Sequence, residues 1–198
     1  PLPKLGWSSA NGTLPNGYAP AYLASGLFGV RVPRYAIGGS VCKDGDPKQC
    51  LGDRTVQCLV GGYEHQQVHG CTVGCDHPDQ NLGGAPAPYP FQTEVNVSAP
   101  GGQQWFSLQQ AITGHSNTTK LKTTSQSLDF ATGEMSTVLG FEAVDGSWSL
   151  ELEVMQLISQ AIPSVALQTL TLSRRAPADL NVSFYPMLTT ENLAVETT

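Results

Sequence analysis

The chain carries little charge. Only 13% of its 198 residues are Asp, Glu, Lys or Arg, and only 10 of them are basic, so that the formal net charge is −6. A protein that binds nucleic acid needs clustered Lys and Arg to neutralise phosphates, and no such cluster occurs. We therefore expect no nucleic-acid partner. Surface helices need charged faces as well, so the composition favours strands and loops over a helical fold.

Long apolar runs and catalytic motifs are also missing. No stretch reaches the roughly 18 consecutive apolar residues of a membrane-spanning helix, so we expect no membrane span. There is no Gly-x-Ser-x-Gly nucleophile elbow and no phosphate-binding glycine loop before a helix. The sequence therefore assigns no catalytic residue and no cofactor. It also shows no internal repeat of fixed period.

Turn-forming residues are abundant, with 21 Gly and 14 Pro. They separate segments of the strand type, of which Trp148–Val154 is the clearest. Its apolar residues alternate with Ser149, Glu151 and Glu153, as in a half-buried strand. The preceding Asp145-Gly146 pair suits the positive φ angles of a tight hairpin. These patterns predict an all-β fold, an antiparallel β-sandwich that forms a single domain over residues 1–198.

The other expected strands lie on both sides of this hairpin. They span 27–32, 91–97, 104–108, 137–141, 164–172 and 180–184, with a further turn at 131–134. The residues that we expect to face the core in the first and last of these strands are Phe28, Val30, Val32, Leu180, Val182 and Phe184.

Five cysteines lie close together, and their spacing lacks the paired Cys-x2-Cys of structural zinc sites. They are Cys42, Cys50, Cys58, Cys71 and Cys75. Disulfides are favoured, so the Cys-, Gly- and Pro-rich stretch 40–90 is predicted to be a disulfide-stapled loop insertion in the sandwich. One cysteine is left over, which is free or pairs outside this sequence, for example with another chain. A Cys/His metal site that uses His65, His69 and His77 is the less favoured alternative, and we assign no metal site.

Four Asn-x-Ser/Thr sequons are a second indication that the protein is secreted. They begin at Asn11, Asn96, Asn117 and Asn181. Asn96 and Asn181 lie between apolar residues of expected strands, so their side chains should face outward, where a glycan can project. Cysteines and sequons together predict a secreted, extracellular protein that carries N-linked glycans.

Two carboxylates have a spacing that suits glycoside hydrolysis. Glu151 and Glu153 are two residues apart on one strand face, so ~7 Å separates them. Inverting glycosidases hold their carboxyl pair ~6.5–9.5 Å apart. A solvated face explains this pair better, because nothing indicates the burial that a general acid needs. Asp44-Gly-Asp46 and Asp76 to Asp79 lack the ligand spacing of a calcium loop and are interpreted as turns.

Aromatic residues offer a carbohydrate-binding alternative, because sugar-binding modules stack rings on pyranose faces. Trp7, Tyr18, Tyr22 and Tyr89 occur among Gly and Pro and are the candidates for exposed platforms. Trp148 falls on the apolar strand face and is expected in the core.

Three segments resemble the N-terminal β-sandwich domain of glycoside hydrolase family 65: Leu128–Met135, Leu150–Val154 and Ile162–Gln168. Asn16-Gly-Tyr18 followed by Leu23–Gly29 looks like the opening element of that domain. The family includes acid trehalases, kojibiose and maltose phosphorylases, and the glucosidase that acts on glucosylgalactosyl-hydroxylysine of collagen. The resemblance implies a super-sandwich fold in a protein that acts on α-glucosides.

The sequence departs from the family in two respects. The Cys-rich stretch is not a family feature, and the catalytic acid of the family lies in a following (α/α)6 barrel that is absent here. Any enzymatic activity would need that separate barrel. Because the family domain usually runs longer, we expect the sandwich to be incomplete at its C-terminus.

The sequence thus leaves three functions open. The first is a non-catalytic N-terminal β-sandwich domain, or a fragment of it, of a secreted, N-glycosylated, family 65-like protein. The second is a structural subunit of a glycosylated extracellular or cell-surface assembly, a fibril or matrix, which could join other chains through the unpaired cysteine or by homo-assembly. The third is a carbohydrate-binding module.

Overall fold

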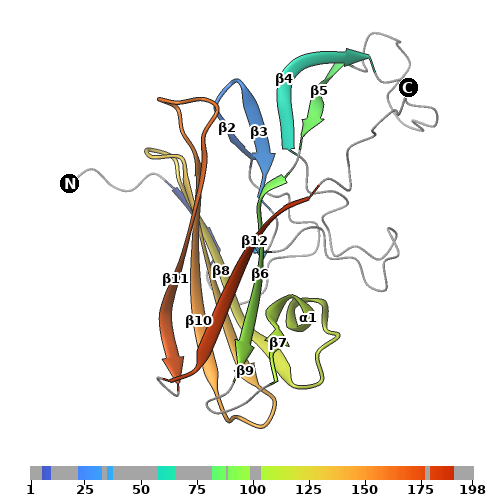
Figure 1. The fold of residues 1–198 in the computed structure, drawn as a ribbon. Helices are drawn as coiled ribbons and strands as arrows, with labels where there is room; N and C mark the ends of the chain where they lie inside the picture. The colour runs from blue at the N-terminus through green and yellow to red at the C-terminus, as the bar shows by residue number, and fades with distance from the viewer. Residues whose placement is uncertain are drawn as a thin grey trace, which may run out of the picture.

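A computed structural model describes residues 6–9, 22–32, 35–37, 58–65, 82–87, 89–98, 104–176 and 179–189 (Figure 1). Strands make up most of this part of the chain, and every described strand pair is antiparallel. The expected all-β antiparallel class is therefore confirmed. The elements are β1 (Gly6–Ser9), β2 (Tyr22–Ala24), β3 (Phe28–Arg31), β4 (Cys58–His65), β5 (Leu82–Ala87), β6 (Tyr89–Ser98), β7 (Phe106–Ser107), α1 (Leu108–Thr113), β8 (Thr119–Asp129), β9 (Glu134–Ala143), β10 (Ser149–Ile158), β11 (Ala166–Ala176) and β12 (Asn181–Thr189).

The strands form three sheets. A five-stranded sheet has the order β1-β8-β9-β10-β11, a three-stranded sheet the order β12-β6-β7, and a four-stranded sheet the order β2-β3-β4-β5. In Figure 1 the long strands β6 and β12 lie in front of the five-stranded sheet, and α1 lies beside β7. The five- and three-stranded sheets therefore form two layers.

The meander β8 to β11 follows directly from sequence periodicity. On β10, Leu150, Leu152 and Val154 are buried, while Glu153 is exposed. The turns that precede β9 and β10 contain glycines at positive φ, +72° at Gly133 and +75° at Gly146. Both hairpins confirm the predicted turns, since residues with a Cβ avoid this region of backbone space.

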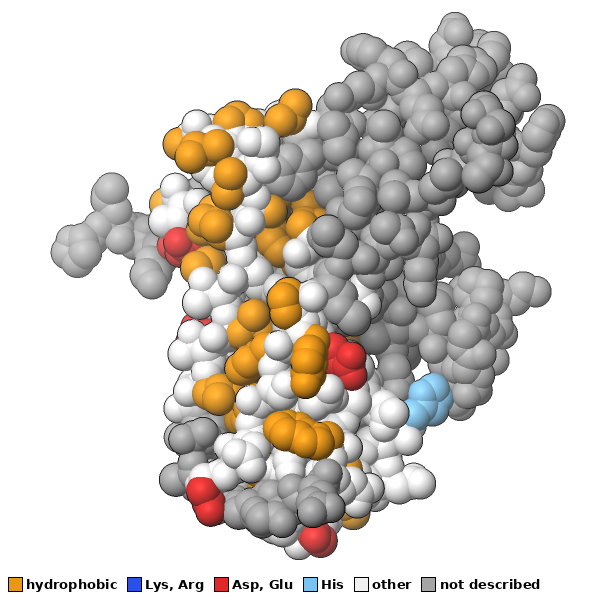
Figure 2. Space-filling view, viewed as in Figure 1, with side chains coloured by type: hydrophobic (Ala, Val, Ile, Leu, Met, Phe, Trp, Pro, Cys, Tyr) orange, Lys and Arg blue, Asp and Glu red, His pale blue; other side chains and the backbone are white. Residues whose placement is uncertain are grey.

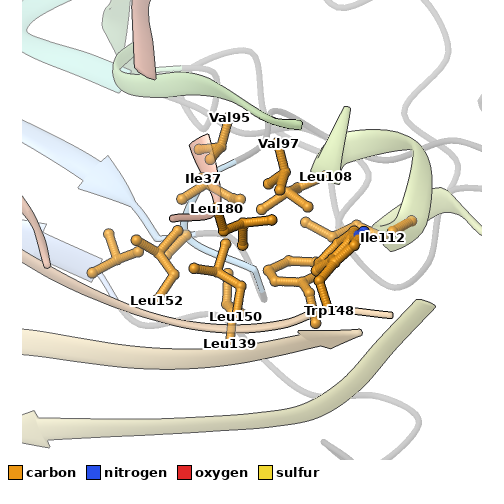
Figure 3. Close-up of a cluster of buried hydrophobic side chains, with 14 of the residues drawn as sticks. Ile37, Val95, Val97, Leu108, Ile112, Leu139, Trp148, Leu150, Leu152 and Leu180 are labelled. Carbon is orange, nitrogen blue, oxygen red and sulfur yellow. The ribbon is translucent and has the colours of Figure 1, made fainter. Parts of the chain in front are cut away.

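A buried apolar cluster joins the two layers (Figure 3). The five-stranded sheet and the residue just before β10 contribute Leu139, Trp148, Leu150 and Leu152, and the other layer covers them. Trp148 is only 4% exposed, which confirms its expected place in the core. The residues that close the cluster from the opposite side are Ile37, Val95, Val97, Leu108, Ile112 and Leu180.

Two local predictions were wrong. Only Phe106–Ser107 of the expected strand 104–108 is extended, and the helix α1 begins at Leu108. The helix forms because Leu108, Ala111 and Ile112 share one helical face and are buried in the cluster. Phe184, expected in the core, is 36% exposed, because β12 is an edge strand with no described neighbour on one side.

The predicted loop insertion 40–90 contains strands in the structure. Cys58 opens β4, where it pairs with Val30 of β3 and Ala87 of β5. The interpretation of this stretch as a loop is therefore corrected at β4 and β5, where backbone pairing extends the sheet that β2 and β3 begin. Cys42, Cys50, Cys71 and Cys75 lie outside the described residues. Cys58 is the single cysteine within them, and the structure gives no support for the disulfide staple.

Candidate functional site

A hollow of about 390 Å³ opens at the end of the two layers where β9 turns into β10. We call it the Trp148 hollow. Its walls come from β7, from the loop before β8 and from the β9–β10 turn, so segments far apart in the sequence meet here. Its lining residues are Phe106, Asn117, Thr118, Ala143, Val144, Asp145, Ser147 and Trp148.

The end of α1 positions one wall of the Trp148 hollow. Gly114 adopts the left-handed conformation with φ of 74° and ends the helix, and the N–H of His115 donates to the carbonyl oxygen of Gln110 at 2.9 Å. The hydroxyl oxygen of Ser116 then accepts the N–H of Thr119 at 3.0 Å. These bonds fix the backbone on both sides of Asn117, whose side chain is exposed.

The β9–β10 turn forms the opposite wall and is bonded to the first. The N–H of Val144 donates to the carbonyl oxygen of Thr118 at 2.8 Å. In the same turn the N–H of Ser147 donates to Oδ1 of Asp145 at 2.9 Å. The hydroxyl of Ser147 and then its N–H stabilise the carboxylate and lower the pKa of Asp145.

Both apolar and polar groups line the Trp148 hollow. Phe106, Ala143 and Trp148 are buried or half-buried, whereas Asn117, Asp145 and Ser147 are exposed. An apolar surface that carries a ring, beside amide, carboxylate and hydroxyl groups, suits a ligand with one apolar face and polar edges. Sugars have this character.

A charged cluster lies on the outer face of the five-stranded sheet near the same end. Glu142 of β9 contacts Lys120 at 2.8 Å and Lys122 at 2.5 Å, both on β8. Lys120 is its direct cross-strand neighbour. Hydrogen bonds from Lys120 and then Lys122 lower the pKa of Glu142.

We expect the contribution of Glu142 to folding stability to decrease at acidic pH. Because the pKa of Glu142 is lower in the folded state, its contribution to stability is present above its unfolded pKa and is lost as pH falls through its folded pKa. Replacing Lys120 and Lys122 by Ala should raise the folded pKa of Glu142 toward its ordinary value. A carboxyl NMR titration of both proteins measures this, and equal midpoints would show that the lysines do not stabilise the carboxylate.

Glu151 and Glu153 lie on the outer face of β10, as the sequence predicts. Glu151 accepts the hydroxyl of Ser173 at 2.9 Å, and Glu153 is exposed and accepts the hydroxyl of Ser136 at 3.3 Å. Both bonds lie at the exposed surface of the sheet and not in the apolar pocket that a general acid needs. The pair is therefore part of a solvated face.

The sequons differ in their surroundings. Asn117 lies exposed on the rim of the Trp148 hollow, and Asn181 is exposed on the edge strand β12. Asn96 is half-buried on the opposite face of β6 from Val95 and Val97, and its amide donates to Oε1 of Glu94 at 3.2 Å. Asn11 lies outside the described residues.

A glutamine network between the layers is a feature that sequence motifs did not reveal. Gln156 and Gln168 donate to the carbonyl oxygen of Ala36 at 3.0 and 3.5 Å, and Gln109 donates to that of Ile37 at 3.3 Å. Ala36 is buried with φ of 54°, a strained value for a residue with a Cβ. The strand period could have revealed Gln156, because it lies in phase with buried Val154 on β10.

Most of the other residues that the sequence suggests for a site lie outside the residues that the structure describes. The side chains of Trp7, Tyr22 and Tyr89 are not described, and neither are Tyr18, His69 and His77 or the two expected Asp turns. His65 is the last residue of β4. The described residues include no group of three or more His, Cys, Asp and Glu side chains arranged to hold a metal ion.

Within the ranges given above, no helix combines the length and hydrophobicity needed to cross a bilayer. Comparison with known proteins finds no matching family model, no matching curated protein and no matching solved structure.

Proposed function

We propose that the chain is a non-catalytic N-terminal β-sandwich domain, or a fragment of one, from a secreted, N-glycosylated protein of the family 65-like, α-glucoside-acting type. The two antiparallel layers that share a core support the sandwich. The exposed sequon residues Asn117 and Asn181 support glycosylation, because a glycan needs a side chain that reaches solvent.

The non-catalytic assignment rests on the hydrogen bonds that the described carboxylates accept. Six described carboxylates accept hydrogen bonds from serine hydroxyls, lysine ammonium groups, a side-chain amide or turn N–H groups. They are Glu94, Asp129, Glu142, Asp145, Glu151 and Glu153. Each is thereby occupied in holding a turn or a sheet face.

A second function, a structural subunit of an extracellular assembly, is favoured by the strand β11. Among the described strands it pairs with β10 alone, and Ala166 to Ser173 carry no charge that would discourage pairing with a further strand. Leu167 is 48% exposed on this strand. Figure 2 shows apolar side chains spread over the face that carries β11 and β12, with few acidic side chains among them.

Affinity isolation of the native protein with an antibody against this chain tests both functions. We expect N-glycans in the intact mass, and we expect that the 198-residue chain alone leaves trehalose, maltose, kojibiose and glucosylgalactosyl-hydroxylysine uncleaved. A native protein without glycans would contradict the secreted glycoprotein, and hydrolysis by the chain alone would contradict the non-catalytic assignment. Recovery in large homo-assemblies, with an intact mass near that of this chain, would favour the structural subunit.

A further inference from the structure

We propose that the Trp148 hollow binds the first N-acetylglucosamine of a glycan attached to Asn117. This inference rests on the proposed glycoprotein function and adds a site to it. Two independent observations meet here: the Asn117-Thr118-Thr119 sequon in the sequence, and an amphipathic hollow that Asn117 itself lines.

The attachment point is held in place. The carbonyl oxygen of Thr118 accepts the N–H of Val144, so the sequon backbone is bonded to the turn across the hollow. The hydroxyl oxygen of Ser116 accepts the N–H groups of Thr118 and Thr119 at 3.3 and 3.0 Å. Because the backbone is fixed, a sugar on Asn117 loses less conformational freedom when it packs than it would on a free loop.

The chemistry of the lining suits this sugar. The half-buried ring of Phe106 and the exposed side chain of Val144 offer apolar area to the C–H face of the pyranose ring. Asp145 and Ser147 offer a carboxylate and a hydroxyl to its hydroxyl and acetamido groups. Asn117 itself is one of the residues that line this hollow, so a sugar attached to it starts at the hollow's rim.

Because the glycan is attached beside the hollow, even a weak affinity is enough to keep the sugar bound there. A group attached next to its binding surface has an effective concentration in the millimolar range or above, so a hollow with little affinity for free sugar is still occupied. The same hollow could instead hold a free carbohydrate from another molecule. The two sources share one chemistry and differ in whether attachment at Asn117 is needed.

The test uses the full chain secreted from a eukaryotic host, with each sequon isolated in turn. The protein N11Q/N96Q/N181Q keeps only the Asn117 sequon, and the matched control N11Q/N96Q/N117Q keeps only that of Asn181. Mass spectrometry measures occupancy. Thermal unfolding is then followed with the glycan intact, trimmed to one N-acetylglucosamine, and absent, in the same protein from host cells grown with an inhibitor of N-glycosylation, which leaves asparagine at the sequon.

For the Asn117 protein we expect trimming to leave Tm unchanged and absence of the glycan to lower Tm by about 2–4 °C, the shift of a modest contact in a protein of this size. Val144→Ser should reduce that difference in the glycosylated protein while changing Tm little in the unglycosylated one. Absence of the glycan from the Asn181 control should leave Tm unchanged. An unoccupied Asn117 overturns the proposal, and so does a glycan whose absence has equal effects at both sites or an effect insensitive to Val144→Ser.

The last arm distinguishes the two sources of sugar. Asn117→Gln is titrated with free chitobiose while the tryptophan fluorescence of the protein is followed, and we expect no saturation below millimolar sugar. Saturable binding in the micromolar range would assign the hollow to a free carbohydrate and overturn the proposal. Glycans at Asn181 together with an empty Asn117 would leave the secreted glycoprotein standing, so the two failures are distinguishable.

Discussion

Leu152→Ala is expected to lower the free energy of unfolding by about 2–5 kcal/mol, the cost of a large-to-small change in a packed core. Leu152 is fully buried on β10 and belongs to the cluster that joins the two layers (Figure 3). The second layer covers it, so the cavity left by the substitution cannot be filled by solvent-side rearrangement. Urea unfolding of both proteins measures the difference.

The neighbouring residue supplies the control. Glu153 is exposed on the other face of β10, where its contact is the hydroxyl of Ser136. Glu153→Ala should change the free energy of unfolding by at most about 0.5 kcal/mol, as for most surface substitutions. If the two substitutions had equal effects, the assignment of the core face of β10 would be wrong.

The sequence predicts well those strands and turns that are determined by residues close together in the chain. Strict alternation on β10 and glycines in the flanking turns act within a few residues, so one strand and its hairpins follow from the sequence alone. The burial of Trp148 follows from the same period.

The errors have non-local causes. Alternation places Phe184 inward, yet its exposure depends on which strands lie beside β12, and sequence spacing does not contain that information. The helix α1 has six residues, too few for a period of 3.6 to stand out beside a two-residue strand. β4 and β5 are rich in Gly and small residues, so they lack the apolar alternation of a strand.

The candidate site could be predicted only in its separate pieces. The sequon at Asn117, the turn at Asp145 and the apolar character of Trp148 are each visible in the sequence. That they meet depends on α1, whose left-handed end at Gly114 directs the chain to the β9–β10 turn. The sequence does not predict the Trp148 hollow because it does not predict the helix α1.

Gln168→Leu is expected to lower the free energy of unfolding by about 1–3 kcal/mol, the cost of leaving a buried polar group without its partner. Oε1 of Gln168 accepts the hydroxyl of Thr93 at 2.9 Å, and its Nε2 donates to the carbonyl oxygen of Phe91 at 3.0 Å. Thr93 is 1% exposed, so water cannot replace the lost acceptor.

Gln156→Leu should cost less, although Gln156 is the more deeply buried of the two glutamines. Its Oε1 is buried and has no hydrogen-bond partner among the described residues, so the substitution removes an unsatisfied atom along with the bond to Ala36. The carbonyl oxygen of Ala36 keeps the 3.5 Å bond from Gln168. We expect a change within about 1 kcal/mol, because a lost bond and a removed unsatisfied oxygen oppose each other.

Chemical unfolding of the two single variants and of Thr93→Val/Gln168→Leu measures this network. The double variant removes donor and acceptor together, so it should be more stable than Gln168→Leu alone. A greater loss for Gln156→Leu than for Gln168→Leu, or no recovery in the double variant, would show that the amides act through shape and packing. The expected order would show instead that hydrogen bonding to the strained segment at Ala36 and to β6 holds the two layers in register.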